Sequence, residues 1–209
     1  MDLSTPMTSV LPSAHGPVLA VLYRSGQPLT GRQVAELTHP RVSQSRTAEI
    51  LRDLASAGLV SAIPAGAAVL YRINEEHLLY DAVVQLSTVR ERLWERIATA
   101  VSAFDLPPLA VVVFGSAARG DGHPGSDIDL LVVLPEQVDE TSLLWWHDLD
   151  ELTSSIRRWT GNDVDLLTYS SGQLAELAAA GERLLAEIRR DGRFVVGSRS
   201  IIPSPEKVA

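Results

Sequence analysis

The spacing of apolar positions predicts three short helices near the start of the chain. Apolar residues recur at helical spacing in three segments, Pro17–Arg24, 31–39 and Ser45–Leu54. Thr30 and Gln33 stand at capping-box spacing before the second segment, where each side chain can accept a hydrogen bond from a free backbone N–H. Ser43 or Ser45 can cap the third helix, and Gly58 suits the position just after its end.

A hairpin follows these helices. The apolar runs Leu59–Ile63 and Val69–Ile73 flank the turn-forming segment Pro64–Ala67, which predicts two paired strands. Helix, helix, turn, helix and hairpin in this order resembles the winged helix-turn-helix domain of bacterial transcription regulators. The segments that carry the resemblance are Leu29–Ala35, Ser45–Leu54, Gly58–Val60 and Leu70–Ile73.

This resemblance implies double-stranded DNA as a partner, with the third helix in the major groove and the hairpin at the backbone. Six residues would then contact DNA: Gln44, Ser45, Arg46 and Thr47 at base edges, and Arg41 and Arg72 at phosphates. Because Arg72 is the only cation in the hairpin sequence, the domain would bind DNA weakly as a monomer. Winged helices also serve as protein-docking or dimerising modules, and this alternative stays open.

An apolar stripe opposite a charged face runs through residues 81–104 and predicts a long connecting helix. The stripe consists of Leu86, Val89, Leu93, Ile97, Val101 and Phe104. It would pack on one of the flanking domains or, alternatively, pair with the same helix of a second copy in a homodimer.

Two strands with a glycine-containing turn between them are expected in the second half of the chain. Leu109–Phe114 is a continuous apolar run, which is typical of a buried strand, and Ser126–Val133 predicts another. Gly115 and Ser116 follow the first strand directly. Because side chains alternate along a strand, Asp127 and Asp129 point to one face of the second strand, while the residue between them enters the core.

These two aspartates indicate a metal site. Neighbouring carboxylates repel each other unless a cation lies between them, and oxygen ligands without a nearby His or Cys suit Mg²⁺. Free backbone N–H groups at Gly115 and Ser116 offer a place for a phosphate. The combination favours phosphoryl or nucleotidyl transfer. A third carboxylate is expected from the strand near 162–168, with Asp165 as the first choice and Asp163 as the alternative.

The same residues resemble the minimal nucleotidyltransferases of the DNA polymerase β superfamily. The family pattern has a strand ending in Gly-Ser, then Ser-Asp-x-Asp, then an aspartate on a later strand. It stands here as Val113–Gly120, Ser126–Leu130 and Val164–Leu166. The match covers about Leu93–Val196 and includes a closing helix and a terminal strand at Asp191–Val196.

The resemblance implies that Asp127 and Asp129 hold two Mg²⁺ ions with the phosphates of an NTP, ATP being the expected one. It implies that Asp165 binds one ion and activates the attacking hydroxyl. The nucleotide-binding residues would be Gly115, Ser116, Arg119 and Ser126. The acceptor would be a hydroxyl of a protein, an RNA or a small molecule, including a co-encoded protein as in toxin–antitoxin-like systems.

Net charge, cysteine content and hydropathy add to this prediction. The net charge of −8 argues at first against nucleic acid, but residues 1–80 carry six Arg and six Asp or Glu and are neutral. The chain has no cysteine, which excludes disulfide frameworks and thiolate metal sites. No apolar run is long enough to span a bilayer, and the first residues lack the pattern of a secretory signal. We therefore expect a cytoplasmic protein without a membrane partner.

The predicted chain is of the α+β class. Its expected parts are a flexible arm (1–16), a winged helix-turn-helix domain (17–80), a connecting helix (81–104), a nucleotidyltransferase domain with a small mixed sheet (105–197) and a tail (198–209). The expected activity is Mg²⁺-dependent transfer of a nucleoside monophosphate, directed or regulated by DNA binding. The alternative is a transcription regulator whose transferase-like domain only senses nucleotide.

Overall fold

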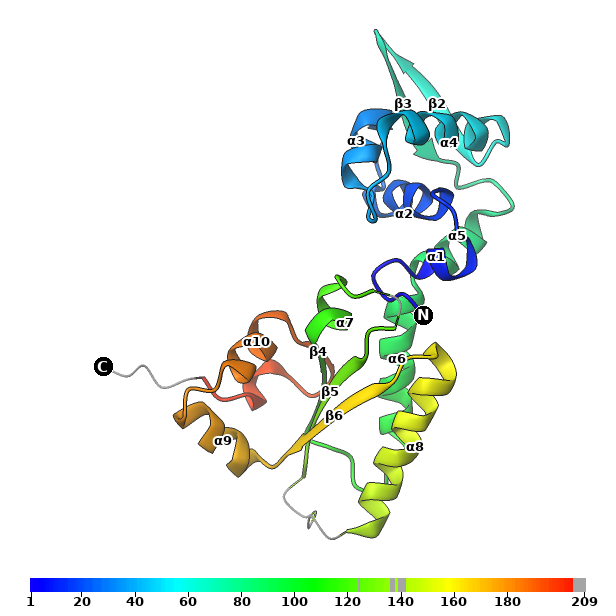
Figure 1. Ribbon diagram of the computed structural model, residues 1–209. Helices are drawn as coiled ribbons and strands as arrows, with labels where there is room; N and C mark the ends of the chain where they lie inside the picture. The colour runs from blue at the N-terminus through cyan, green and yellow to red at the C-terminus, as the bar shows by residue number, and fades with distance from the viewer. Residues whose placement is uncertain (124, 136–137, 139–141, 205–209) are drawn as a thin grey trace. The chain divides into compact units, whose positions relative to one another are not determined.

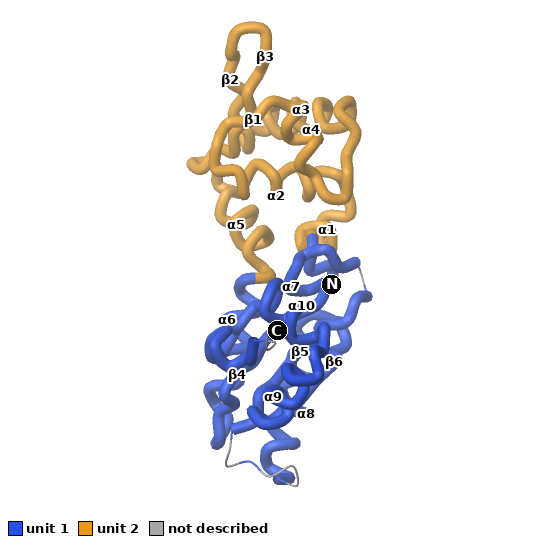
Figure 2. The backbone as a smooth tube through the Cα atoms, turned by 90° about the vertical axis from the view of Figure 1, so that its left-hand side faces the viewer, with its two compact units in different colours: residues 1–4, 91–209 blue, residues 5–90 orange. Residues whose placement is uncertain are grey.

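The chain folds into two compact units. The computed structural model describes residues 1–123, 125–135, 138 and 142–204. Thr5–Arg90 form one unit, the N-terminal unit, and Glu91–Ala209 together with Met1–Ser4 form the other, the C-terminal unit (Figure 2). Both contain helices and a sheet, which confirms the predicted mixed fold class.

The N-terminal unit has the element order of a winged helix. Its elements are α1 (Pro6–Val10), α2 (His15–Ser25), β1 (Leu29–Thr30), α3 (Gly31–Leu37), α4 (Gln44–Ser56), β2 (Val60–Ala65), β3 (Ala68–Ile73) and α5 (Tyr80–Ser87). The strands form an antiparallel sheet in the order β1-β3-β2. The three predicted helices and the hairpin are therefore confirmed.

Local hydrogen bonds explain where these helices begin. Thr30 Oγ1 accepts the N–H of Gln33 at 3.3 Å, and Gln33 Oε1 accepts the N–H of Thr30 at 2.9 Å, which completes the capping box of α3. Ser43 caps α4 by accepting the N–H of Arg46 at 3.3 Å, so Ser43 rather than Ser45 is the cap. Gly58 adopts a left-handed φ of 78° after the end of α4.

The C-terminal unit is built on a mixed sheet. Its elements are α6 (Val89–Val101), β4 (Ala110–Phe114), α7 (Gly115–Arg119), β5 (Ile128–Val133), α8 (Leu143–Thr160), β6 (Val164–Tyr169), α9 (Ser171–Ala179), α10 (Arg183–Asp191), β7 (Arg193–Val196) and a 3₁₀ turn (Arg199–Ile201). The strand order is β6-β5-β4-β7, with β5 and β6 parallel and the other neighbours antiparallel.

Helices cover both faces of this sheet (Figure 1). Val111 and Val113 of β4 pack with α6 and α8 in one core, whereas Ala110 and Val112 pack with α9 and α10 in the other. A strand that is buried on both faces needs apolar residues at every position, which explains the uninterrupted run in β4.

The connecting segment is not the single helix that the stripe predicts. α5 ends at Ser87 and α6 begins at Val89, because Thr88 leaves the helical conformation with φ −103° and ψ 12°. Val83 packs in the core of the N-terminal unit, whereas Leu93 and Ile97 pack in the core of the C-terminal unit. The chain itself covers Leu93, Ile97 and Val101 of the stripe, whereas Leu86 and Val89 are only partly buried.

Two segments that were expected to be loose contain buried residues in their described parts. The arm at 1–16 contains α1, with Leu3 and Met7 buried in the C-terminal and N-terminal units respectively. In the tail at 198–209, Ile202 is fully buried, while residues 205–209 lie outside the described part. The prediction of a flexible arm is wrong, and so is that of a loose tail as far as residue 204, since a few apolar side chains in a polar segment are enough to anchor it. None of the helices in the described ranges is long and apolar enough to cross a membrane.

Candidate functional site

Two parallel strands bring three carboxylates together at one place on the sheet of the C-terminal unit. The register of β5 and β6 pairs Asp129 with Asp165, and neighbouring strands lie about 4.8 Å apart. Asp127 lies two residues before Asp129 and shares its face, because Ile128 between them is fully buried. Asp127 and Asp165 are exposed, and Asp129 is partly buried.

The negative charges of Asp165 and Asp127 act on Asp129. Burial, together with the charges of Asp165 and Asp127, raises the pKa of Asp129 above its ordinary value, and the Arg119 guanidinium acts in the opposite direction. The charged form of Asp129 is therefore disfavoured in the protein alone. A cation bound among these carboxylates would remove the penalty.

Gly115 lies directly against Asp129. Phe114 at the end of β4 pairs with Asp129, and Gly115 then turns the chain into α7 with a φ of 64°. A Cβ atom at position 115 would lie 1.9 Å from Asp129 Oδ2. The left-handed φ and the close approach both require glycine here.

Asp165 and Asp163 have different surroundings. The side chain of Asp163 is 65% exposed and forms an ion pair with Arg157 at 3.1 Å. Asp165 is the residue that pairs with Asp129 and contributes to its raised pKa. This geometry favours Asp165 over Asp163 as the third carboxylate.

Two serine hydroxyls lie beside the carboxylates, Ser116 on α7 and Ser126 in the loop that follows it. A Cβ atom at Gly122 would lie 3.1 Å from Ser116 Oγ and 3.5 Å from Ser126 Oγ. Ser126 Oγ accepts the N–H of His123 at 3.0 Å. Ser116, Ser126 and Asp127 line one small crevice, so the serines expected to bind nucleotide lie next to an expected metal ligand.

Arg119 stands at the end of α7, close enough to affect Asp129. Its Nε donates a hydrogen bond to Asp121 Oδ2 at 2.9 Å, and this bond raises the pKa of the guanidinium. Arg119 therefore supplies positive charge to the site while its side chain is engaged by a neighbouring carboxylate.

The donor set fits Mg²⁺ rather than a metal that needs a complete protein cage. In residues 1–123, 125–135, 138 and 142–204, no three carboxylate, imidazole or thiol groups are arranged to hold a metal ion by themselves. Mg²⁺ is usually bound through one or two carboxylates and completes its coordination with water and substrate phosphates. Asp127, Asp129 and Asp165 offer oxygen donors of this kind.

Asn162 is a site residue that the sequence pattern does not predict. Its side chain is almost completely buried, and its Nδ2 donates to the carbonyl of Ser126 at 2.9 Å. No motif marks this residue, and the only signal is its place between a helix and a carboxylate-bearing strand. This hydrogen bond links the segment just before Asp127 to the segment just before Asp165.

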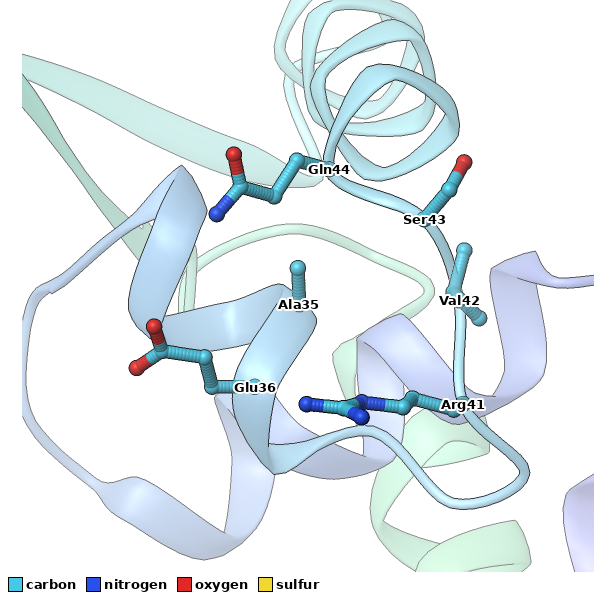
Figure 3. Close-up of a pocket in the computed structure, with 6 residues that line it drawn as sticks. All are labelled: Ala35, Glu36, Arg41, Val42, Ser43 and Gln44. Carbon is cyan, nitrogen blue, oxygen red and sulfur yellow. The ribbon is translucent and has the colours of Figure 1, made fainter.

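Five of the six residues expected to contact DNA lie around the start of α4, and the sixth, Arg72, lies on β3. Gln44, Ser45 and Arg46 are exposed on α4, and Arg41 is exposed in the loop before it. Figure 3 shows Arg41 extending toward α3 and Gln44 projecting from the first turn of α4, and both line a hollow of about 360 Å³. Thr47 is fully buried, so its predicted base contact is wrong.

Ion pairs compensate two of the expected DNA-binding cations. Arg46 contacts Glu49 at 2.9 Å, and Arg72 contacts Glu75 at 2.6 Å. Exposed pairs of this kind contribute about 0–1 kcal/mol, so a DNA phosphate can replace the carboxylate at little cost. The compensation nevertheless lowers the positive potential of the surface.

Comparisons with known proteins bear on the C-terminal half. The family model of the nucleotidyltransferase domain matches residues 94–195. No curated protein matches the chain significantly. Solved structures with a similar fold include a toxin–antitoxin with AMP-PNP, at 21% identity and a TM-score of 0.36, covering 51% of this chain and 75% of that one.

Two further structures are similar over different shares of the chain. A putative nucleotidyltransferase from Sulfolobus solfataricus has 25% identity and a TM-score of 0.29, covering 49% of this chain and 76% of that one. TrmBL2, an archaeal chromatin protein whose structure shows a mode of DNA binding, has 16% identity and a TM-score of 0.32, covering 90% and 78%.

Proposed function

Because residues 94–195 are a nucleotidyltransferase domain of the DNA polymerase β superfamily, we propose that the chain transfers a nucleoside monophosphate from an NTP to a hydroxyl acceptor. The observation that carries this proposal is the register of β5 and β6, which sets Asp129 opposite Asp165 while Gly115 lies against the Asp129 carboxylate. ATP is the NTP that we expect, and the acceptor is a protein, an RNA or a small molecule.

In the proposed reaction the acceptor oxygen attacks the α-phosphorus, and the bond to the β-phosphate breaks. The acceptor gains the nucleoside monophosphate and loses a proton, and pyrophosphate leaves. We assign Asp165 to the acceptor side, where its exposed carboxylate orients the hydroxyl and accepts the proton. We assign Asp127 and Asp129 to the nucleotide side, because Asp127 lines the same crevice as Ser116 and Ser126.

Mg²⁺ would be held by Asp127, Asp129 and Asp165, and two ions are expected. When bound, Mg²⁺ supplies positive charge that stabilises the attacking and leaving oxygens of an in-line displacement. The raised pKa of Asp129 supports this assignment, because crowded carboxylates are expected where a cation normally compensates them.

We assign the triphosphate to Gly115, Ser116, Ser126 and Arg119. Gly115 and Ser116 are the first residues of α7, where backbone N–H groups can donate hydrogen bonds to a phosphate. The hydroxyls of Ser116 and Ser126 can each donate to a phosphate oxygen. Arg119 would exchange its exposed ion pair with Asp121 for the triphosphate, which costs little because the pair is solvated.

We further propose that the N-terminal unit binds double-stranded DNA and so directs or autoregulates the transferase. Arg41, Gln44, Ser45 and Arg46 would make the contacts at α4, and Arg72 would contact phosphate from the hairpin. Because a DNA target and an NTP are both found in the cytoplasm, we expect the protein to act there.

Transfer of label from an α-labelled NTP to components of a cell extract tests the enzymatic proposal. The full chain with Mg²⁺ should label an acceptor, and Asp129→Asn should reduce labelling by more than about 100-fold, since even outer partners of metal ligands are worth 10–100-fold. Asp163→Asn is the matched control, because it removes the carboxylate that pairs with Arg157, and it should retain the activity. Nucleotide binding without transfer would instead support a regulator that only senses nucleotide.

A further inference from the structure

The first four residues of the chain belong to the C-terminal unit. Met1–Ser4 group with Glu91–Ala209, although Thr5–Arg90 form the other unit. The side chain of Leu3 is 6% exposed and packs in the same core as Ala117 and Ile128. Residues 1–4 also lie outside the segment that matches the nucleotidyltransferase family model. The transferase unit is thus completed by a segment far away in the sequence.

Leu3 fills the space beneath the expected nucleotide-binding loop. Met1 and Leu3 line one crevice with Ser116, Ser126 and Asp127, and only about 10 Å³ of it is open. A buried leucine in so small a space restricts how far the loop can move toward it, because interiors of this density resist compression.

The amide of Asn162 joins this N-terminal segment to the loop. Its Nδ2 donates to the carbonyl of Met1 at 3.1 Å and to the carbonyl of Ser126 at 2.9 Å. Its Oδ1 accepts a hydrogen bond from the Met1 nitrogen at 2.9 Å, and its backbone N–H donates to Thr160 Oγ1 at 3.1 Å. Both amide protons of the side chain are therefore used, and their directions are fixed by the planar group.

These contacts lead directly to the carboxylates. Ser126 is the neighbour of Asp127, and Asn162 stands three positions before Asp165 in the sequence. The N–H of Ile128 donates to the carbonyl of Asp163 at 2.9 Å, which is the first bond between the two strand segments. The buried side-chain amide of Asn162 thus connects the residues just before β5 with those just before β6, where the pairing of the two strands begins.

We propose that Met1, Leu3 and Asn162 form a positioning clamp that sets the separation of Asp127 and Asp165 for the proposed transfer reaction. In this proposal the clamp residues have a positioning role: Asn162 acts through the carbonyl of Ser126, and Met1 and Leu3 support it from the same crevice. This inference rests on the proposed function. It adds Asn162 and the segment Met1–Ser4 to the parts of the chain on which the carboxylate site depends.

Binding of Mn²⁺ alone, measured by electron paramagnetic resonance on the full chain, tests the clamp. Asn162→Ala should weaken Mn²⁺ binding by about 10–100-fold, the usual effect of losing a group that orients metal ligands. Asn74→Ala is the matched control, because the Asn74 amide also donates to a backbone carbonyl, that of Gly58 at 2.9 Å, but in the other unit. It should leave Mn²⁺ binding unchanged.

Hydrogen exchange of the metal-free protein gives a second measurement. The N–H of Ile128 should exchange faster in Asn162→Ala than in the wild type, while the N–H groups in the middle of β4 stay protected. If Asn162→Ala does not fold, Leu3→Ala is measured in its place. Leu3→Met, which conserves the volume, should behave as the wild type.

Separate results would overturn the clamp and the proposed function. If Asn162→Ala lowers the melting temperature but leaves Mn²⁺ affinity and Ile128 exchange unchanged, Asn162 is only a structural residue and the clamp is wrong. If the wild type binds Mn²⁺ no better than Asp129→Asn, the metal assignment in the proposed function fails. In that case the hydrogen-exchange rate of the Ile128 N–H still tests the clamp. Faster exchange in Asn162→Ala than in the wild type would show that the clamp holds the two strand segments together.

Discussion

Gly115 and Asp129 occupy complementary space, since a Cβ atom on Gly115 would lie 1.9 Å from Asp129 Oδ2. Gly115→Ala must therefore displace the Asp129 carboxylate or distort the turn into α7. We expect a loss of transfer of about 100-fold, because a misplacement of about 1 Å is enough for such a loss. Label transfer from an α-labelled NTP measures it.

Gly181→Ala provides the control for backbone strain. Gly181 has a similar left-handed φ of 71°, but no atom lies within 4 Å of its Cβ position. Both variants carry the backbone cost of about 1–2 kcal/mol, yet only Gly115→Ala should lose transfer. An equal loss in both would mean that strain, and not contact with Asp129, explains the need for glycine at 115.

The raised pKa of Asp129 predicts how stability depends on pH. A carboxyl group whose pKa is higher in the folded than in the unfolded state favours folding while it is protonated, and this contribution is lost as the pH rises through the folded-state pKa. Without divalent cations, Asp129→Asn should therefore melt at a higher temperature than the wild type at neutral pH. The difference should disappear at acidic pH.

Mg²⁺ should change the stability of the protein through the same carboxylates. Because a bound cation favours the charged carboxylates, it should raise the melting temperature of the wild type at neutral pH and have a smaller effect on Asp129→Asn. Melting curves with Mg²⁺ and with a chelator measure both effects. A wild type that is more stable than Asp129→Asn in the chelator would contradict the proposed crowding of carboxylates.

Ion pairing on α4 predicts an unusual gain of DNA affinity. Glu49→Gln removes a negative charge and releases Arg46 from its 2.9 Å ion pair, so non-specific DNA binding should become tighter. Arg41→Ala should weaken binding and reduce the slope of log K against log salt by about 1. Fluorescence anisotropy with a duplex at several salt concentrations measures both.

Thr47→Val is the control for this surface. Thr47 is fully buried, so the substitution should leave DNA affinity and its salt dependence unchanged. If Glu49→Gln and Arg41→Ala also leave binding unchanged, the N-terminal unit does not use α4 to contact DNA. The winged helix would then be a protein-docking module.

Local signals in the sequence were sufficient for most of the fold. The capping box of Thr30 and Gln33 depends on residues that are neighbours in the chain, and the structure confirms it. The strand at Ile128–Val133 follows from its apolar run in the same way. The burial of Thr47 was also predictable, because helical spacing places it on the same face as Ile50 and Leu54.

The remaining features depend on contacts between distant segments. Leu3 is buried by residues more than a hundred positions away, and Ile202 is covered by the helices on one face of the sheet. The role of Asn162 depends on the carbonyls of Met1 and Ser126, which no periodicity brings together. The break between α5 and α6 separates a stripe that is continuous in the sequence, because its halves pack in two different cores.

The position of the label in ATP distinguishes nucleotide transfer from every other use of the triphosphate. We predict that the full chain with Mg²⁺ and extract passes the label of α-labelled ATP to an acceptor, while the label of γ-labelled ATP appears only in pyrophosphate. Both signals should be lost in a chelator and in Asp129→Asn. Transfer of the γ-label to an acceptor, or ATP that is bound but stays intact, would contradict nucleotidyl transfer at Asp127, Asp129 and Asp165.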